Sequence, residues 1–263
     1  MLCLKTRKKL KLLSGEGDQK MAESRYSEIL DEWRAKDIQN RDDLSVAMGE
    51  KAISLAYHTN RLEYLAITYH DTEDVFKQNR VNNFTGDTRI VFAIKDAKNA
   101  WNLFLDSFND MRPIDEALVK EFHFELTLGT YAGERYRHGE RPGEYKIGDY
   151  VTGRYEVGAP PEDVPMEMQE LLGELEDVPA DKVLVAAAYF HVKFENIHGF
   201  ADGNGRTGRL LMNYFLACNN HPLIIIHEEN RKEYMSALEA WDLNQDLDPM
   251  KIFLESQTVK TWS

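Results

Sequence analysis

Cysteine and long apolar runs are both scarce in this chain of 263 residues. Its only two cysteines, Cys3 and Cys218, cannot form a disulfide framework, so we expect a reducing, cytoplasmic compartment. No stretch approaches the roughly 20 apolar residues that cross a bilayer. The beginning of the chain also lacks the apolar segment of a secretory signal. These absences predict a soluble chain without a membrane partner.

Positive charge is also in short supply, since 32 Lys and Arg stand against 45 Asp and Glu, for a net charge of -13. Nucleic acids and anionic membranes need a dense positive surface, so neither is expected as a partner. Residues 5–11 differ, with five bases and no acid. We expect residues 1–22 to be a basic, disordered extension, and the alternatives are a binding arm or a true start at Met21.

Proline is absent from residues 23–108, and the pattern there predicts several helices in an N-terminal region, residues 23–110. Within residues 87–108, apolar side chains recur at the spacing of one buried helix face. These side chains are Ile90, Ala93, Ile94, Ala97, Trp101, Phe104 and Phe108. Farther along, Asp181 is expected to cap a helix that continues to Ile197. Residues 256–263 are expected to be a C-terminal tail.

A glycine-rich turn, HGFADGNGRTGR, follows that helix at residues 198–209. Gly203, Gly205 and Gly208 have the spacing of a dinucleotide-binding fingerprint, with Glu228 as its candidate acid. That fingerprint needs a strand running straight into the first glycine, whereas HVKFENIHGFAD separates the preceding apolar run from Gly203. The dinucleotide interpretation is therefore not favoured.

A hydrolytic metal site would recruit His191, Glu195, His198 and Asp202. HExxH is absent, and no other dense cluster of ligands is present, so zinc is not expected. Asp202 instead supplies the single carboxylate that Mg²⁺ commonly takes when phosphate oxygens complete its coordination. His198 has a side chain suited to removing a proton from an attacking hydroxyl.

The remaining polar groups of the turn suit a polyphosphate. Backbone N–H groups of Gly203, Asn204 and Gly205 form an anion cradle if a helix begins there, with Asn204 as the candidate N-cap. Arg206 and Arg209 are three residues apart and can neutralise the phosphates from one helix face. Base, metal ligand, anion cradle and charge clamp together indicate phosphoryl or nucleotidyl transfer.

This stretch resembles the signature H-x-F-x-D/E-G-N-G-R-x-x-R of the Fic-domain family. Gly199 stands where the family usually has proline, and weaker similarity covers residues 143–254. The fixed positions are filled by His198, Phe200, Asp202, Gly203, Asn204, Gly205, Arg206 and Arg209. The resemblance implies a mainly α fold, a Fic-type helical bundle with a short β-hairpin flap, and a catalytic core over residues 111–255.

The resemblance also implies an enzyme that transfers AMP from ATP to a Ser, Thr or Tyr hydroxyl of a target protein. His198 would be the base, Asp202 would hold Mg²⁺, and the backbone of residues 203–205 and both arginines would bind the ATP phosphates. Tyr234 and Leu238 match the adenine pocket, although Met235 replaces a common tyrosine. The flap, near residues 149–157, would hold the target, and a homodimer is a further expected partner.

Upstream, residues 58–72 resemble the family's inhibitory helix S/T-x-x-x-E-G/N. Thr59 and Glu63 match, whereas Tyr64 departs from the usual glycine or asparagine. The resemblance implies that Glu63 pairs with Arg209 and so competes with the ATP γ-phosphate. The alternatives for the whole chain are transfer of UMP, removal of AMP from a modified target, and a nucleotide-sensing regulatory module.

Overall fold

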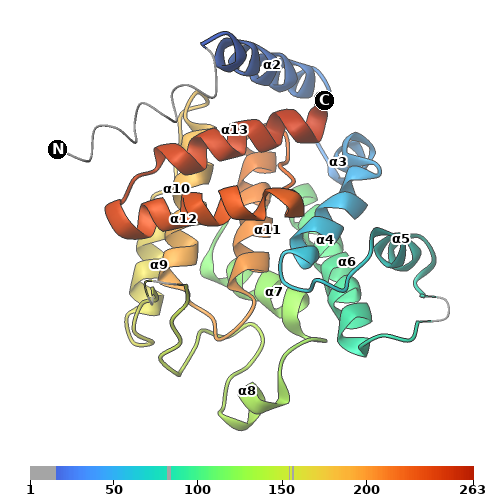
Figure 1. Ribbon diagram of the computed structural model, residues 1–263, viewed down its shortest axis with the longest axis vertical. Helices are drawn as coiled ribbons and strands as arrows, with labels where there is room; N and C mark the ends of the chain where they lie inside the picture. Colours follow the sequence, from blue (N-terminus) through green and yellow to red (C-terminus); the bar gives the residue numbers. More distant parts are fainter. Residues whose placement is uncertain (1–15, 82–83, 154, 156) are drawn as a thin grey trace.

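The computed structural model describes residues 16–81, 84–153, 155 and 157–263, with side chains from Arg25 onward. This part of the chain is mainly α-helical, as expected (Figure 1). In chain order the elements are α2 (Glu16–Arg34), α3 (Arg41–Met48), α4 (Lys51–Arg61), α5 (Tyr69–Gln78), α6 (Thr88–Asn109), α7 (Glu116–Thr127), α8 (Gly133–Arg137), α9 (Val164–Gly173), α10 (Val183–Ile197), α11 (Asn204–Cys218), the 3₁₀ turn η1 (Glu228–Asn230), α12 (Arg231–Asn244) and α13 (Asp248–Trp262).

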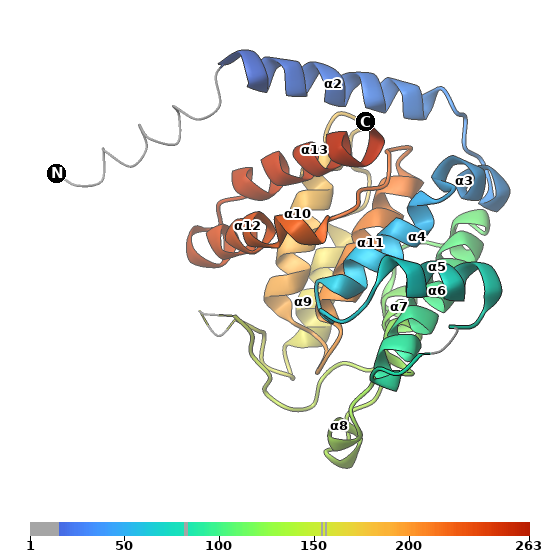
Figure 2. The same cartoon turned by 45° about the vertical axis from the view of Figure 1, so that its right-hand side comes forward.

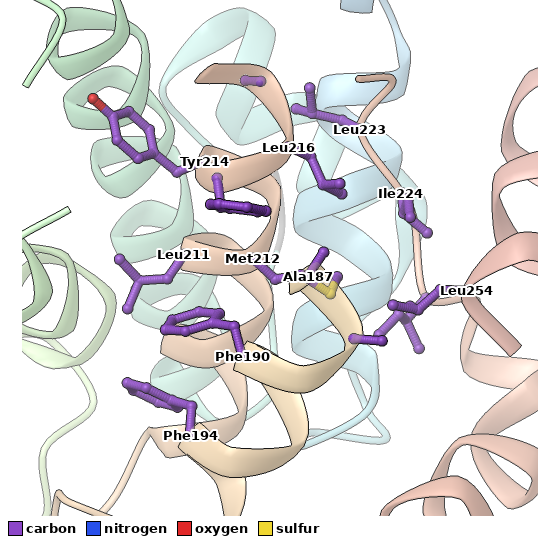
Figure 3. Packing of buried hydrophobic residues seen from close by; sticks show 14 of the residues in the cluster. Ala187, Phe190, Phe194, Leu211, Met212, Tyr214, Leu216, Leu223, Ile224 and Leu254 are labelled. Carbon is purple, nitrogen blue, oxygen red and sulfur yellow. The ribbon is translucent and has the colours of Figure 1, made fainter. Parts of the chain in front are cut away.

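Helices α10 and α11 pack against each other at the centre of the hydrophobic core (Figure 3). Phe190 and Phe194 of α10 and Leu211, Met212 and Tyr214 of α11 are all completely or almost completely buried. Because α10 is apolar around most of its circumference, it needs cover on several sides. α9, α12 and α13 supply that cover, while α7, α6 and α4 pack on α11. The turn between α10 and α11 is thereby held by two rigid helices.

The helix predicted over residues 87–108 is α6, and its predicted apolar face is buried or, at Phe108, half-buried. Asp87 is its N-cap, where the carboxylate accepts a hydrogen bond from the Arg89 N–H at 2.9 Å. The 3.6-residue periodicity was sufficient to predict this helix because most of its packing lies on one face. Asp181, in contrast, does not cap α10, which begins after Lys182 without a side-chain cap.

Both predicted terminal segments are largely helical where the structure describes them. Residues 16–22 belong to α2, which lies along α13 (Figure 2), while residues 1–15 are outside the described residues. In the predicted tail, residues 256–262 are the last part of α13. Gln257 and Thr261 are buried there and accept hydrogen bonds from the backbone N–H groups of His227 and Ile225. Hydrogen bonds to its side chains therefore hold the C-terminal part of α13 against the segment before α12.

The predicted β-hairpin flap is present only as a minimal pairing. Thr152 and Val157 form one antiparallel bridge, with reciprocal backbone hydrogen bonds of 2.9 and 3.0 Å. No β-strand occurs within the described residues, and positions 154 and 156 lie outside them. The bridge belongs to the long connection between α8 and α9, whose base is fixed by bonds from Lys146 N–H to the Gly199 carbonyl and from Ala159 N–H to the Ile197 carbonyl.

Candidate active site

A cavity of about 910 Å³ opens at the N-terminal end of α11. It is bounded by the glycine-rich turn, the segment after α4, one face of α12 and the segment around the Thr152–Val157 bridge. This last segment, residues 149–153, 155 and 157, is termed the bridge segment. The predicted site residues that line it are Glu63, His198, Asp202, Gly203, Asn204, Gly205, Arg206, Arg209, Tyr234 and Leu238. Thr59 lies behind Arg209 rather than in the cavity wall. The fold thus brings together residues from parts of the chain about 175 positions apart, since Glu63 and Leu238 line one cavity.

His198 directly follows α10 and adopts a left-handed backbone conformation, with φ 49° and ψ 54°. This conformation ends the helix and turns the chain into the cavity wall, while the His198 N–H still bonds to the Phe194 carbonyl. Burial, followed by the positive charges of Lys146 and Arg135, lowers the pKa of His198 to about 4. The imidazole is therefore neutral at neutral pH and has a nitrogen able to accept a proton.

The start of α11 differs from the predicted cap. Gly203, with φ +81°, is the N-cap, and Asn204 is the first helical residue. The Asn204 amide accepts a bond from the Phe200 N–H and donates one to the Phe200 carbonyl, so this side chain ties the turn together. A Cβ on Gly203 would lie 2.5 Å from Thr127 Cγ2, so both conformation and space require glycine.

Arg206 is buried and held by the end of α7. It donates to the Leu126 carbonyl at 2.9 Å and to the Thr130 hydroxyl at 3.3 Å. Its Nη2 also lies 3.8 Å from Asp202 Oδ1, and the Tyr64 ring lies 5.4 Å from its guanidinium carbon. These contacts fix the guanidinium in the wall of the cavity beside the glycine-rich turn.

Arg209 and Glu63 form an ion pair, with Nη2 and Oε1 2.8 Å apart. The guanidinium also donates to the hydroxyl and the carbonyl of Thr59, so both predicted residues of the upstream motif contact Arg209. The Arg209 side chain is 5% exposed, whereas that of Glu63 is 41% exposed and faces the cavity. Burial raises the pKa of Glu63, but the charge and hydrogen bond of Arg209 outweigh it and keep this pKa below its ordinary value.

The Glu63 carboxylate lies over the first turn of α11. Its Oε1 would be only 2.8 Å from a Cβ on Gly205, so the missing side chain leaves room for an acidic group there. The N-terminal end of a helix attracts anions through its unpaired N–H groups and its dipole. Glu63 thus occupies a position suited to a phosphate oxygen.

Asp202 is the residue available for a magnesium ion. Its Oδ1 accepts the Gly203 N–H at 2.6 Å, and its side chain is 44% exposed and lines the cavity. No group of three or more His, Cys, Asp and Glu suited to a metal occurs among the described residues. A single carboxylate fits Mg²⁺ nevertheless, because this ion retains waters and shares phosphate oxygens.

Tyr234 and Leu238 both reach the cavity from α12, but in different ways. Tyr234 is buried, and its hydroxyl lies 2.8 Å from His191 Nε2 and 3.5 Å from Arg209 Nη1. The Tyr234 hydroxyl therefore accepts a long hydrogen bond from Arg209. Leu238, in contrast, is half-buried in the cavity wall. His191 is an entirely buried residue of α10.

Two contributors to this site carry no recognisable sequence signal. His123, on α7, binds the Asp202 carbonyl, and Glu140 accepts the N–H groups of Ile147 and Gly148 immediately before the bridge segment. Both are far from the motif in sequence, and neither belongs to a recognised motif. Only the packing of α7 and its following loop against the turn reveals them.

No helix in the described part of the chain is both long and apolar enough to cross a membrane.

Comparison with known proteins gives a family match. Residues 113–216 match the model described as the Fic/DOC family. This segment contains α7 to α10 and most of α11, including the whole glycine-rich turn.

Several curated relatives are named protein adenylyltransferase Fic. The protein of Drosophila persimilis is 43% identical over 75 residues, covering 28% of this chain and 15% of its own length. That of Drosophila mojavensis is 28% identical over 248 residues, covering 89% of this chain and 47% of its own length. A probable protein adenylyltransferase of Aquifex aeolicus is 28% identical over 158 residues, 59% of this chain and 46% of its own length. This chain therefore spans less than half the length of these relatives.

Solved structures show the same fold over nearly the whole chain. A Fic domain containing signaling protein from Bacteroides thetaiotaomicron has a TM-score of 0.75 at 23% identity, covering 90% of this chain and 94% of its own. Residues 134–508 of Fic-1 from C. elegans have a TM-score of 0.76 at 23% identity, covering 98% of this chain and 74% of that chain. Residues 113–216 of this chain are thus similar to the Fic/DOC family in sequence, and the solved structures share the fold around them.

Proposed function

We propose that this chain is a protein adenylyltransferase that moves AMP from ATP to a Ser, Thr or Tyr hydroxyl of a target protein, with Mg²⁺ bound beside the phosphates. The main support is that His198, Asp202, Arg206 and Arg209 converge on one cavity at the N-terminal end of α11. The name protein adenylyltransferase, carried by relatives with matching sequence, agrees with this chemistry.

In the proposed reaction, the target oxygen bonds to the α-phosphorus while the bond from that phosphorus to its bridging oxygen breaks. Pyrophosphate leaves, and the hydroxyl proton passes to His198. The negative phosphates would raise the pKa of His198 from about 4 towards neutrality, which makes it a better proton acceptor. N–H groups at the start of α11 and both arginines would stabilise the developing charge. Held by Asp202, Mg²⁺ would neutralise charge on the phosphates.

The bridge segment is the proposed docking site for the target. Its residues 149–153, 155 and 157 line the cavity beside His198, and Val151 and Tyr155 are exposed. An extended target peptide could add to this segment through backbone hydrogen bonds, which select an extended shape rather than one sequence. The hydroxyl would then be presented to His198.

Glu63 is proposed to restrain this activity. Because one guanidinium cannot give the same N–H to a carboxylate and to a phosphate, the Glu63–Arg209 pair keeps ATP from its productive position. The end of α4 is also anchored at Glu228, which lies 3.7 Å from Arg61 Nε, accepts from the Tyr57 hydroxyl, and donates its N–H to His58 Nδ1. Release of Glu63 would therefore involve movement of the segment after α4.

Intact mass spectrometry tests the chemistry. Purified Glu63→Gly protein, incubated with Mg²⁺ and ATP, is expected to gain one or more AMP groups by self-modification, or to transfer AMP to a target protein. The Glu63→Gly/His198→Ala double variant should bind ATP but show no transfer, since loss of a general base typically costs about 10²–10⁴-fold. Equal AMP incorporation by both proteins would refute the role of His198. Nucleotide binding without transfer to any protein would instead favour the sensing alternative.

A further inference from the structure

His123 is a completely buried histidine on α7 with two backbone partners. The Gly143 N–H lies 2.8 Å from Nδ1, and the Asp202 carbonyl oxygen lies 2.8 Å from Nε2. A backbone N–H can only donate and a carbonyl can only accept, so the ring carries its proton on Nε2. Acceptance at Nδ1 together with donation from Nε2 defines the neutral form of the ring.

One end of this ring supports the reactive turn. The carbonyl that accepts from Nε2 joins Asp202 to Gly203, the N-cap of α11. The ring also stacks on Phe200, with centroids 3.8 Å apart and planes 7° from parallel. His123 therefore fixes the peptide between the metal-binding carboxylate and the first N–H groups of the anion cradle.

The other end of the ring contacts the base of the bridge segment. Gly143 begins the stretch in which Lys146 N–H bonds to the Gly199 carbonyl, one residue after His198. Within Gly143 itself, φ is +79°, and a Cβ would lie 3.2 Å from the Lys120 carbonyl of α7. The loop thus runs close against α7, and His123 joins it to the glycine-rich turn.

We propose that His123 is a positioning residue, whose Nε2–H and Nδ1 set the Asp202–Gly203 peptide relative to the loop that begins the target-docking segment. It does not touch the reacting atoms and acts through the orientation of Asp202 and the cradle. The proposal rests on the proposed function for its link to transfer, but its effect on binding of Mg²⁺ and ATP is separate.

Two substitutions divide the contacts of the ring. In His123→Gln, the amide lies as many bonds from Cα as Nε2 does and can donate to the Asp202 carbonyl. In His123→Asn, the amide lies at the distance of Nδ1 and can accept only from Gly143. Both variants lose one hydrogen bond and the aromatic ring, so their losses of stability in urea should be similar. His221→Gln is a matched control, since His221 is also buried with two partners, the Tyr26 hydroxyl and the Pro222 carbonyl.

The variants are compared in the Glu63→Gly background by calorimetric titration with ATP and Mg²⁺, and by the initial rate of AMP transfer. His123→Asn should weaken Mg²⁺-dependent ATP binding and lower kcat/KM by at least about tenfold, because small misplacements of site groups are costly. His123→Gln should retain most of both, and the His221→Gln control should bind as its parent does. Equal binding defects in the Asn and Gln variants would overturn the proposal and leave His123 a core residue. If the parent shows no transfer, the proposed function fails, while the binding measurement still decides the role of His123.

Discussion

Substitution of Glu63 by glycine is the sharpest test of restraint. The change removes the carboxylate 2.8 Å from Arg209 Nη2, while the guanidinium keeps its bonds to Thr59 and its contact with the Tyr234 hydroxyl. A hydrogen bond to a charged group contributes about 1.5–3 kcal/mol, so its removal should raise transfer about 10- to 100-fold. The same loss leaves a buried positive charge without its acid, so the variant should be less stable than wild type without ligand.

The assay is the initial rate of AMP incorporation from labelled ATP, measured beside the shift in unfolding temperature caused by ATP and Mg²⁺. Glu63→Gln is the matched control, because it keeps the shape and an amide oxygen but loses the charge, and should fall between wild type and Glu63→Gly. The ligand-induced shift should be larger in Glu63→Gly, because the phosphates replace the missing carboxylate. Equal rates and equal shifts in all three proteins would refute the competition for Arg209.

Three further predictions concern the turn and the acid response. Asp202→Ala should lose Mg²⁺-dependent stimulation of transfer, and undiminished wild-type activity in excess chelator would contradict this role. Gly203→Ala should destabilise the fold by about 1–3 kcal/mol in urea unfolding, since a left-handed backbone and a 2.5 Å contact with Thr127 both oppose a Cβ; unchanged stability would contradict the geometry. Burial lowers the pKa of His221 to about 4. Between pH 6.5 and pH 4, His221 is therefore protonated in the unfolded chain but neutral in the folded chain, so the free energy of unfolding decreases as the pH is lowered. From pH 7 to 5 this lowers the free energy of unfolding of wild type by about 2 kcal/mol. His221→Gln lacks this titration, so the difference in unfolding free energy between wild type and His221→Gln should decrease by that amount. A difference that stays constant with pH would refute the assigned protonation of His221.

Local patterns were sufficient for the features whose cause is local. The apolar stripe of α6 predicted its buried face. The glycine-rich turn predicted both the family match of residues 113–216 and its own residues that meet at the cavity. A turn of this kind can be recognised from sequence because its glycines and charged groups lie within twelve consecutive positions of the chain. The ends were less predictable: residues 16–22 and 256–262 are helical. Helix α2 lies along α13, and buried side chains of α13 accept hydrogen bonds from backbone N–H groups of the segment before α12.

Asn204 was identified from sequence as a motif residue, but its hydrogen-bond partners were not predicted. The sequence predicted a cap, but the side chain bonds back to Phe200 because Gly203 takes the cap position with positive φ. The short pairing of Thr152 with Val157 is a similar case, since residues that favour a hairpin do not set how far its ladder extends.

The sequence alone determined the chemical groups of this protein and, through periodicity, the helix α6 with its buried face. The resemblance implied that Glu63 meets Arg209, 146 positions away, and the structure has this contact. Only the tertiary structure decided that His123 reaches the Asp202 carbonyl, 79 positions away. Helical spacing specifies a buried face but not its partner, and a lone histidine or glutamate has no periodic signal at all. His123 is neutral with two hydrogen bonds, and Arg209 is buried, because α7 and α4 pack on α11 and exclude water from the polar groups between them.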